Sequence, residues 1–353
     1  MKKIAFLVCL ALSINMKAQL NVDEVIPSKT DIEKIKSNTM VVVLFSENQE
    51  YIQTLTKKNK TEDLAFYKKS IESYNANIKE VIPKFFNIAK EIKFLNIDEV
   101  AAMMPAEKKE FSFLVFNVSA SLGGNNDMNT KSNNAFAWQS LSFDFYNSNP
   151  KSKYTENYKT IHFSDDNADY TKMEIYLRDT KNSDSKMVGL KNYPNIAPTK
   201  ADLIHTYRWL SGRFKEVAEG KKKVEPDGSP LKQKTLYICS DNLNKKLTEA
   251  EIKKKYKYKF KIVSKEEFDN ALINQDSSVC LLYVMPMVKT AMGGAPTGIS
   301  AARSAITFGQ IIMDAKTGTV CALAFAKFNM GGVGSSYDDV KAKHFDDYLK
   351  YIK

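Results

Sequence analysis

Two glycine-rich stretches in the second half of the chain come closest to a known binding chemistry. Residues 293–300, GGAPTGIS, have two glycines at the separation found in phosphate-binding loops, but Ile299 stands where such a loop needs its lysine. A nucleoside triphosphate site of that kind is therefore not expected. If this stretch converges with the glycines of residues 329–336, the two form a site for a small molecule or a peptide, and otherwise they are flexible connections. The candidate ligand-binding residues are Gly293, Gly294, Gly298, Gly331 and Gly332.

The three histidines offer acid–base or metal chemistry. His205 and His344 occupy matching places on two predicted helices, each four residues before an aromatic side chain. Neither has a second ligand at the spacing of a zinc site such as His-x-x-x-His. We therefore expect both to pack against the aromatic ring one helical turn on. His162 has no partner that the sequence reveals, and no Gly-x-Ser-x-Gly elbow marks a hydrolase. No catalytic residue, metal ligand or cofactor is predicted.

Three of the four cysteines, Cys239, Cys280 and Cys321, lie within apolar runs of the kind that form strands. A reactive thiolate is usually stabilised at the start of a helix, and zinc sites usually contain Cys-x-x-Cys pairs. Neither pattern is present. Because an odd number of cysteines cannot all pair, we expect buried thiols with at most one disulfide, and the sequence does not say which cysteines would form it.

Lysine supplies almost all of the positive charge. The chain of 353 residues has a formal net charge of +11, yet arginine occurs only at Arg178, Arg208, Arg213 and Arg303. Because the planar guanidinium makes most bidentate contacts with phosphates and base edges, its scarcity argues against a sequence-specific nucleic-acid reader. Residues 253–261, KKKYKYKFK, could bind a polyanion. Their alternation of lysines and aromatic residues is, however, what an amphipathic strand gives.

Residues 1–18 have the form of a secretory signal peptide. Lys2 and Lys3 precede a short apolar run, and small residues follow near Ala18. The run is too short to cross a bilayer as a helix. Cys9 lies in the middle of the run, where it does not fit a lipoprotein cleavage motif. We therefore expect an exported protein, periplasmic or secreted, without a lipid anchor or a transmembrane segment.

The chain repeats itself. Residues 94–116 align with residues 262–284 without a gap, and each segment reads as a strand, a helix and a strand. The sequence therefore predicts two copies of one unit, residues 19–218 and residues 235–353. A charged segment with two prolines, residues 219–234, is the predicted linker.

The predicted fold class is α/β with mixed sheets, a tandem duplication of a β-α-β-α-β unit with an antiparallel hairpin and a closing helix. In the first copy, strands are expected at residues 39–45, 91–95, 111–118, 138–146, 160–163 and 172–178, and helices at 31–35, 61–82, 98–107 and 199–214. In the second copy, strands are expected at residues 235–240, 258–263, 279–284, 305–313 and 319–328, and helices at 248–255, 265–274 and 337–352. Exposed loops are expected at residues 119–134, 285–300 and 329–334.

This order of elements, with a hairpin that turns on Asp-x-x-Thr-Gly, resembles the amino-terminal domain of TolB and the CsgG-like envelope proteins. The likeness lies in residues 263–272, 276–279 and 310–318. It implies an envelope module that is not an enzyme and acts through protein contacts. Residues 239–242 stand where those families place a Pro-Phe segment, so the resemblance implies a topology and no functional residue.

The leading hypothesis is an exported envelope protein that binds a protein partner or assembles with it, without catalysis. The alternative is a small-ligand-binding or weakly enzymatic periplasmic protein that uses the glycine loops of the second copy. A third hypothesis is self-association through edge strands. The sequence does not identify the partner or the ligand.

Overall fold

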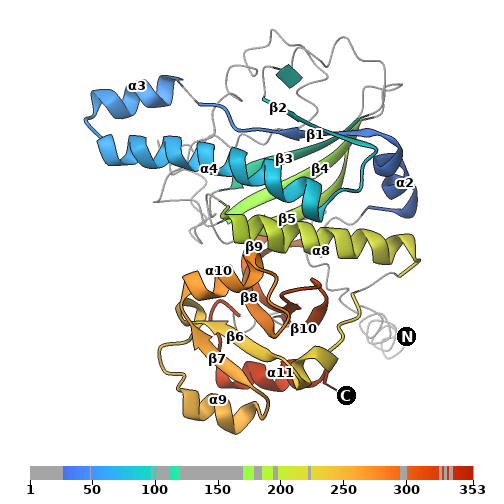
Figure 1. The fold of residues 1–353 in the computed structure, drawn as a ribbon, viewed down its shortest axis with the longest axis vertical. Helices are drawn as coiled ribbons and strands as arrows, with labels where there is room; N and C mark the ends of the chain where they lie inside the picture. Colours follow the sequence, from blue (N-terminus) through green and yellow to red (C-terminus); the bar gives the residue numbers. More distant parts are fainter. Residues whose placement is uncertain are drawn as a thin grey trace, which may run out of the picture.

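The structure, a computed structural model, contains two five-stranded sheets with one long helix lying between them (Figure 1). The residues that it describes are 27–47, 49–96, 99–100, 111–119, 170–178, 185–193, 198–221, 224–294, 300–325, 328–329, 332–333 and 337–352. The first sheet comes from the first half of the chain and the second sheet from the second half (Figure 1). We call residues 27–221 the first unit and residues 224–352 the second unit.

The first sheet has the strand order β2-β1-β3-β4-β5. Its strands are β1 (Thr39–Val43), β2 (Glu91–Leu95), β3 (Phe111–Ser119), β4 (Tyr170–Arg178) and β5 (Ser185–Tyr193). β1 pairs in parallel with β2 and β3, whereas β3 with β4 and β4 with β5 are antiparallel. The predictions of β1 to β4 are confirmed. β5 was not predicted, since its sequence SKMVGLKNY mixes Gly, Lys and Asn with few apolar residues. The strands expected at residues 138–146 and 160–163 lie outside the described residues.

The second sheet has the same order and the same strand directions. Its strands are β6 (Thr235–Cys239), β7 (Phe260–Val263), β8 (Val279–Gly294), β9 (Ser300–Asp314) and β10 (Val320–Phe325). β6 pairs in parallel with β7 and β8, and β9 joins β8 to β10 by antiparallel pairing. Two short strands, β11 (Phe328–Asn329) and β12 (Gly332–Val333), pair separately.

The two sheets also agree in register. Thr39 lies opposite Phe111 in the first sheet, and Thr235 lies opposite Val279 in the second. Phe111 and Val279 are equivalent positions within the gapless match of residues 94–116 with residues 262–284. The edge strands β2 and β7 take up the same register against β1 and β6. The chain is therefore a mixed α/β protein with two sheets of equal topology.

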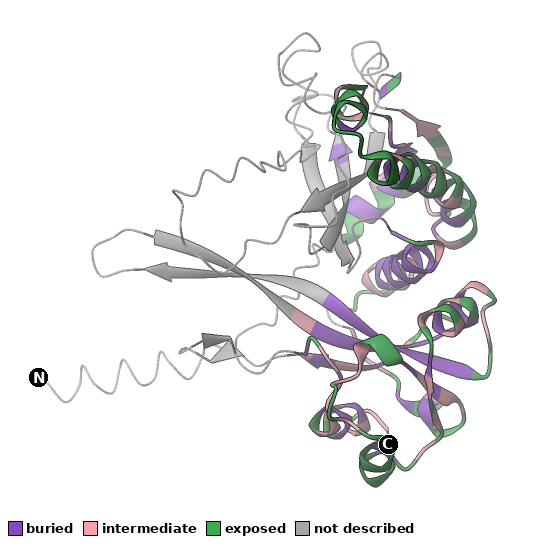
Figure 2. Ribbon diagram, turned by 90° about the vertical axis from the view of Figure 1, so that its left-hand side faces the viewer, coloured by how far each residue is buried: buried purple, intermediate pink, exposed green. Residues whose placement is uncertain are grey.

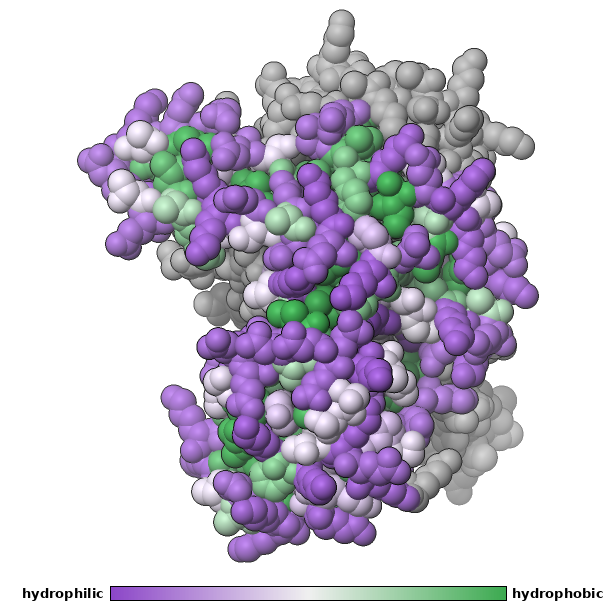
Figure 3. All heavy atoms as spheres, in the orientation of Figure 1, coloured by the Kyte–Doolittle hydropathy of each residue, from purple (hydrophilic) through white to green (hydrophobic). Residues whose placement is uncertain are grey.

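Among the described residues, four helices belong to the first unit, α2 (Lys29–Ser37), α3 (Gln49–Lys57), α4 (Thr61–Phe85) and α8 (Lys200–Ala218). α8 begins at a capping box in which Thr199 and Asp202 satisfy each other's backbone N–H groups. α4 continues through Pro83, beyond the predicted end at residue 82, and the N–H of Phe86 still donates to the carbonyl oxygen of Ile82 at 2.9 Å. α3 was not predicted. Hydrophilic side chains cover most of the face in Figure 3, with apolar ones gathered along α3 and α4.

The described helices of the second unit are α9 (Glu249–Lys255), α10 (Lys265–Ile273) and α11 (Phe345–Leu349), with short 3₁₀ turns η1 (Ser229–Lys232), η2 (Ser240–Asn242) and η3 (Ala342–His344). The caps Thr248 and Ser264 start α9 and α10 close to the predicted positions. The closing helix is shorter than the predicted residues 337–352, and that prediction is wrong in extent. Val340 instead forms a parallel bridge with Leu243, because this segment is held by contacts with the rest of the unit.

The glycine-rich segment that the sequence predicts as a loop is in large part strand. β8 pairs with β9 continuously from Cys280 and Asp314 to Gly294 and Ser300. The loop prediction is therefore wrong for residues 285–294. Long cross-strand pairing outweighs the local preference of proline and glycine for turns, which a pattern of single residues cannot show.

Helix α8 lies between the sheets, and every residue from Ala201 to Leu210 is buried (Figure 2). One hydrophobic core joins α4, α8, α10 and one face of the second sheet. A second core fills the other face of that sheet beneath α9 and α11. Alternate residues of β8 enter the two cores, with Leu281 and Tyr283 in the first and Cys280 in the second.

The second half of the predicted linker packs on the second unit. Leu231 is fully buried in the second core, and the N–H of Asp227 donates to the carbonyl oxygen of Val320 at 2.9 Å. A Cβ at Gly228 would lie 2.3 Å from the carbonyl oxygen of Tyr351, so glycine is required there. The sequence could not reveal this packing because one buried leucine makes no periodic pattern.

Candidate functional site

Helix α8 presents one face to each unit. Its apolar stripe consists of Leu203, Tyr207, Leu210 and Phe214. The rings of Tyr207 and Phe214 each lie 5.4 Å, between centroids, from the ring of Phe86 at the end of α4. Leu203 and Leu210 are buried in the same core. This stripe holds α8 on the first unit.

The opposite face of α8 is polar, yet it is buried against the second unit. His205 is 1% exposed, and its ring centroid lies 3.8 Å from that of Tyr283 on β8. Arg208, about one turn further on, donates a hydrogen bond to the carbonyl oxygen of Ala315 in the β9–β10 turn. The two units are therefore joined through polar side chains of one helix.

Both histidines pack on aromatic rings, as predicted, but on rings from other elements. His205 contacts Tyr283 on β8. His344 stacks on Tyr337 with 4.2 Å between ring centroids, and the predicted partner Tyr348 instead donates a hydrogen bond to Gln310. The predicted ring partner of His344 is thus wrong, because buried strands and turns compete with the next helical turn for the imidazole.

The β9–β10 turn is the Asp-x-x-Thr-Gly segment that the sequence singles out. One carboxylate oxygen of Asp314 accepts hydrogen bonds from the N–H groups of Lys316 and Thr317, both at 2.9 Å, and the other accepts from Lys234. Burial alone would raise the pKa of Asp314, but these donors outweigh it and hold the pKa below its usual value. Three hydrogen bonds to one carboxylate therefore stabilise the β9–β10 turn.

Glycine is needed at Gly318 for two reasons. Its φ is +75°, and a Cβ there would lie 3.1 Å from the Cβ of Arg208. The β9–β10 turn consequently packs closely against α8. The Asp-x-x-Thr-Gly turn thus forms a contact between the two units.

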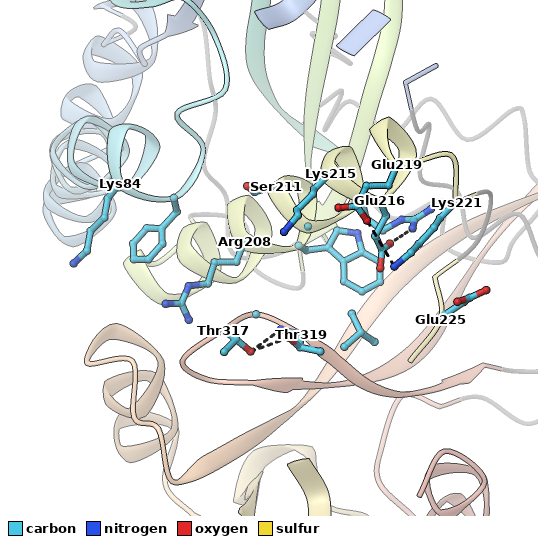
Figure 4. Close-up of a pocket in the computed structure, with 16 residues that line it drawn as sticks. Lys84, Arg208, Ser211, Lys215, Glu216, Glu219, Lys221, Glu225, Thr317 and Thr319 are labelled. Atoms are coloured by element: carbon cyan, nitrogen blue, oxygen red, sulfur yellow. Dashed lines mark hydrogen bonds and ion pairs between the residues drawn. The ribbon is translucent and has the colours of Figure 1, made fainter. Parts of the chain in front are cut away.

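A cleft of about 520 Å³ opens beside this contact, between α8 and the β9–β10 turn (Figure 4). α4 contributes Lys84 and Phe85 to its wall, and α8 contributes Arg208, Trp209 and Gly212. The remaining lining residues are Ser211, Arg213, Lys215, Glu216, Glu219, Lys221, Glu225, Thr317, Gly318, Thr319 and Val320. The volume lies within the range of about 300–1,000 Å³ that is common for ligand sites.

The charges are distributed unequally along the cleft. At one end Arg213 forms an ion pair with Glu216, and Lys221 lies 3.8 Å from Glu219. At the other end Arg208 projects toward the β9–β10 turn (Figure 4), and the ion pairs of the described residues include none for this arginine. We call this second end, formed by Lys84, Phe85 and Arg208, the Arg208 end.

None of the five predicted ligand-binding glycines lines this cleft. Gly293 and Gly294 are the last residues of β8, opposite Ala301 and Ser300. Gly332 pairs with Asn329 in the separate β11–β12 sheet. Gly298 and Gly331 lie outside the described residues. Gly293 and Gly294 thus belong to one sheet and Gly332 to another, and the role of the five glycines in binding stays a prediction.

The cysteines are buried on two sides of the second sheet. Cys280 and Cys321 are fully buried in the second core with their Sγ atoms 3.9 Å apart. Cys239 belongs to the first core, on the other side. All three are free thiols. The sheet itself thus separates Cys239 from the other two.

We expect Cys239, Cys280 and Cys321 all to remain thiols. β9 lies between β8 and β10, so the backbones at Cys280 and Cys321 are about 9–10 Å apart, whereas a disulfide needs Cα atoms within about 7 Å. The contact with Cys280 and burial raise the pKa of Cys321 and keep it protonated. Alkylation after unfolding without reductant should label all three positions, as read by peptide mass spectrometry. A peptide that links Cys280 to Cys321 would contradict this expectation.

Three of the six lysines in residues 253–261 have acidic partners. Lys253 pairs with Glu249 at 2.8 Å, Lys255 with Asp346 at 3.1 Å and Lys261 with Glu267 at 2.5 Å. Tyr256 is 1% exposed, and burial raises its pKa. These contacts favour the structural interpretation of the run over polyanion binding.

Searches against known protein families, curated proteins and solved structures give no significant match to this chain. Within the described ranges, no helix combines the length and apolar character that a membrane crossing needs. The same ranges contain no group of three or more His, Cys, Asp or Glu side chains placed to hold a metal ion. The candidate site therefore stands on its own geometry.

The cleft was missed at the sequence level because its walls come from α4, α8 and the β9–β10 turn. One signal was available, however. Asp202, His205 and Arg208 recur every three residues on α8, opposite its apolar stripe. A helix with an apolar stripe and a second stripe that contains His and Arg is a candidate for burial on two sides.

Proposed function

We propose that the chain is an exported, non-catalytic binding or assembly protein, in which two copies of one α/β unit act as a single body. In this proposal the cleft between α8 and the β9–β10 turn receives a segment of the partner. The observation that carries the proposal is the cleft of about 520 Å³ at the junction of the two units. Sites at such junctions are common places for ligand recognition.

The duplication is supported by three independent features. The two sheets have the same strand order and directions, the same register of parallel strands, and equivalent positions in a gapless sequence match. Repeated units that share one core move together. The core around α8 contains residues of both units, which favours recognition by one rigid body over recognition by two hinged domains.

Binding is favoured over catalysis because the reactive side chains that the sequence singles out are engaged in structural contacts. His205 packs on Tyr283, Asp314 accepts hydrogen bonds from the backbone of the β9–β10 turn, and Cys321 lies in the second core. The export signal and the resemblance to envelope modules point the same way, toward a partner in the cell envelope. A small ligand, the alternative, would use the same cleft.

Gly212 provides a direct test. It lines the cleft, and a Cβ built on it meets no atom within 4 Å. A side chain at position 212 would therefore start in open space, and Gly212→Trp should occupy part of the cleft. We expect a crosslinked pull-down of the tagged mature protein from its own envelope to recover a stoichiometric partner, and the tryptophan variant to lose about tenfold or more of it.

Gly212→Ala is the matched control. Alanine in a helix interior should raise the free energy of unfolding by about 0.5–1 kcal/mol, measured by chemical denaturation, and should leave partner recovery unchanged. Equal recovery with alanine and tryptophan would place the partner on another face. Turnover of a substrate that one point substitution abolishes would contradict the non-catalytic proposal.

A further inference from the structure

The Arg208 end of the cleft contains a buried cation without a carboxylate partner. Arg208 is 8% exposed, and its hydrogen bond among the described residues goes to a neutral carbonyl, that of Ala315. The face of the Phe85 ring lies 4.8 Å from its guanidinium carbon. A guanidinium has five N–H donors, and buried charges are normally paired. The unused donors are not among the buried side-chain atoms that lack a partner, so they are open to an acceptor that enters the cleft.

Among the described residues, no ion pair joins Arg208 to Asp314, the carboxylate that bonds Lys234. Asp314 lies close enough to act electrostatically on Arg208. Its two oxygens, however, are already bonded to Lys234 and to the N–H groups of the turn. Burial is the largest cause that lowers the pKa of Arg208, and it outweighs the opposite effects of Tyr283 and Asp314.

A second cation stands beside this arginine. Lys84 is exposed, its Nζ lies 5.3 Å from the centroid of the Phe85 ring, and the described residues give it no ion pair. Phe85 thus lies within cation–π range of both Lys84 and Arg208. The opposite end differs, since its Arg213 and Lys221 already have glutamate partners. The other charged lining residues balance in number, three cations against three carboxylates, so the positive charge left over is that of Lys84 and Arg208. These other residues are Arg213, Lys215, Lys221, Glu216, Glu219 and Glu225.

We propose that the Arg208 end of the cleft binds an anionic group, a carboxylate or a phosphate, of the molecule that the cleft receives. The planar fork of Arg208 would hold two oxygens of that group, with Phe85 stacked behind it, and Lys84 would close the site as a point charge. This inference rests on the proposed function in taking the cleft as the binding site. It adds the chemical class of the recognised group.

Trp209 also lines the cleft and provides the readout. In a Trp138→Phe background, Trp209 is the single tryptophan left to report. We would titrate inorganic phosphate, an acetylated dipeptide with a free carboxylate, and the same dipeptide as its amide, at constant ionic strength. We expect saturable fluorescence changes with phosphate, with the carboxylate or with both, and none with the amide. The stronger of the two anions identifies the source of the charge.

Two lysine substitutions form the matched pair. Lys84→Gln should raise the Kd of the anion about fivefold to tenfold, whereas Lys221→Gln at the neutralised end should leave it within about twofold. Arg208→Lys, which keeps the charge but loses the fork, should raise it about tenfold or more. No saturable response to either anion, or equal effects of the two glutamine variants, would overturn the inference.

The outcomes separate this inference from the proposed function. A protein partner that Gly212→Trp abolishes, together with no anion response, would overturn the anion site and leave the binding proposal standing. A saturable anion response that depends on Lys84, without any envelope partner, would support the anion site and contradict the assembly proposal.

Discussion

Replacing Gln310 by leucine should lower the free energy of unfolding by about 3–5 kcal/mol. Gln310 is fully buried on β9. Its Nε2 donates to the carbonyl oxygens of Tyr337 at 3.1 Å and Asp339 at 2.8 Å, and its Oε1 accepts from the hydroxyl of Tyr348. Leucine fills the space but leaves these three groups without their partner, at about 1–3 kcal/mol each. Chemical denaturation monitored by circular dichroism measures the loss.

Tyr348→Phe is the matched control, because it removes one donor and keeps both carbonyl contacts. We expect a loss of about 1–2 kcal/mol from the unpaired Oε1 of Gln310. The double variant should be more stable than the sum of the single losses predicts, because it lacks the Tyr348 hydroxyl that Gln310→Leu leaves without a partner. A cost for Gln310→Leu no larger than that of Tyr348→Phe would show that the amide does not hold the 337–340 segment.

The parts of the fold that the sequence predicts are those that local chemistry decides. β2 has the predicted bounds, Glu91–Leu95, and α10 starts at its predicted first residue, Lys265. Continuous apolar runs and side-chain caps are properties of a few neighbouring residues. The same is true of the hairpin across the Asp314 turn, whose carboxylate bonds lie within three residues.

The errors occur where distant partners decide the structure. Residues 285–294 read as a loop, but β9 gives each of them a cross-strand partner. Residues 337–341 read as helix, but Gln310 and Leu243 hold their backbone in another conformation. In both cases a local preference worth a few tenths of a kcal/mol per residue gives way to several tertiary hydrogen bonds.

The candidate site shows the same limit more strongly. Lys84, Arg208 and Thr317 are separated by more than a hundred residues at each step, and Lys84 carries no local signal of its own. The glycines that did carry a signal lie elsewhere in the fold. A cleft formed between two units cannot be seen in the sequence of either unit alone. The polar stripe of α8, formed by Asp202, His205 and Arg208, was the one sign of this cleft in the sequence.

His344 should set the acid limit of stability. It is fully buried, and its Nδ1 accepts a hydrogen bond from the backbone N–H of Lys341 at 3.2 Å. Burial is the largest cause that lowers the pKa of His344 to about 4. The charges of Lys343 and Lys341 lower it further, whereas Asp339 and Asp347 act in the opposite direction. The folded chain therefore keeps this imidazole neutral where a free histidine would be protonated.

Between pH 6.5 and about 4 the unfolded chain binds a proton at His344 that the folded chain does not, so the free energy of unfolding falls as the pH falls through this window. His344→Gln stays neutral throughout. Between pH 7.5 and 4.5 the natural chain should therefore lose about 2–3 kcal/mol relative to the variant. Urea denaturation of both proteins across this range measures the difference, and the titration of shared carboxylates cancels. Parallel stability curves would show that the imidazole is solvated or protonated in the folded chain.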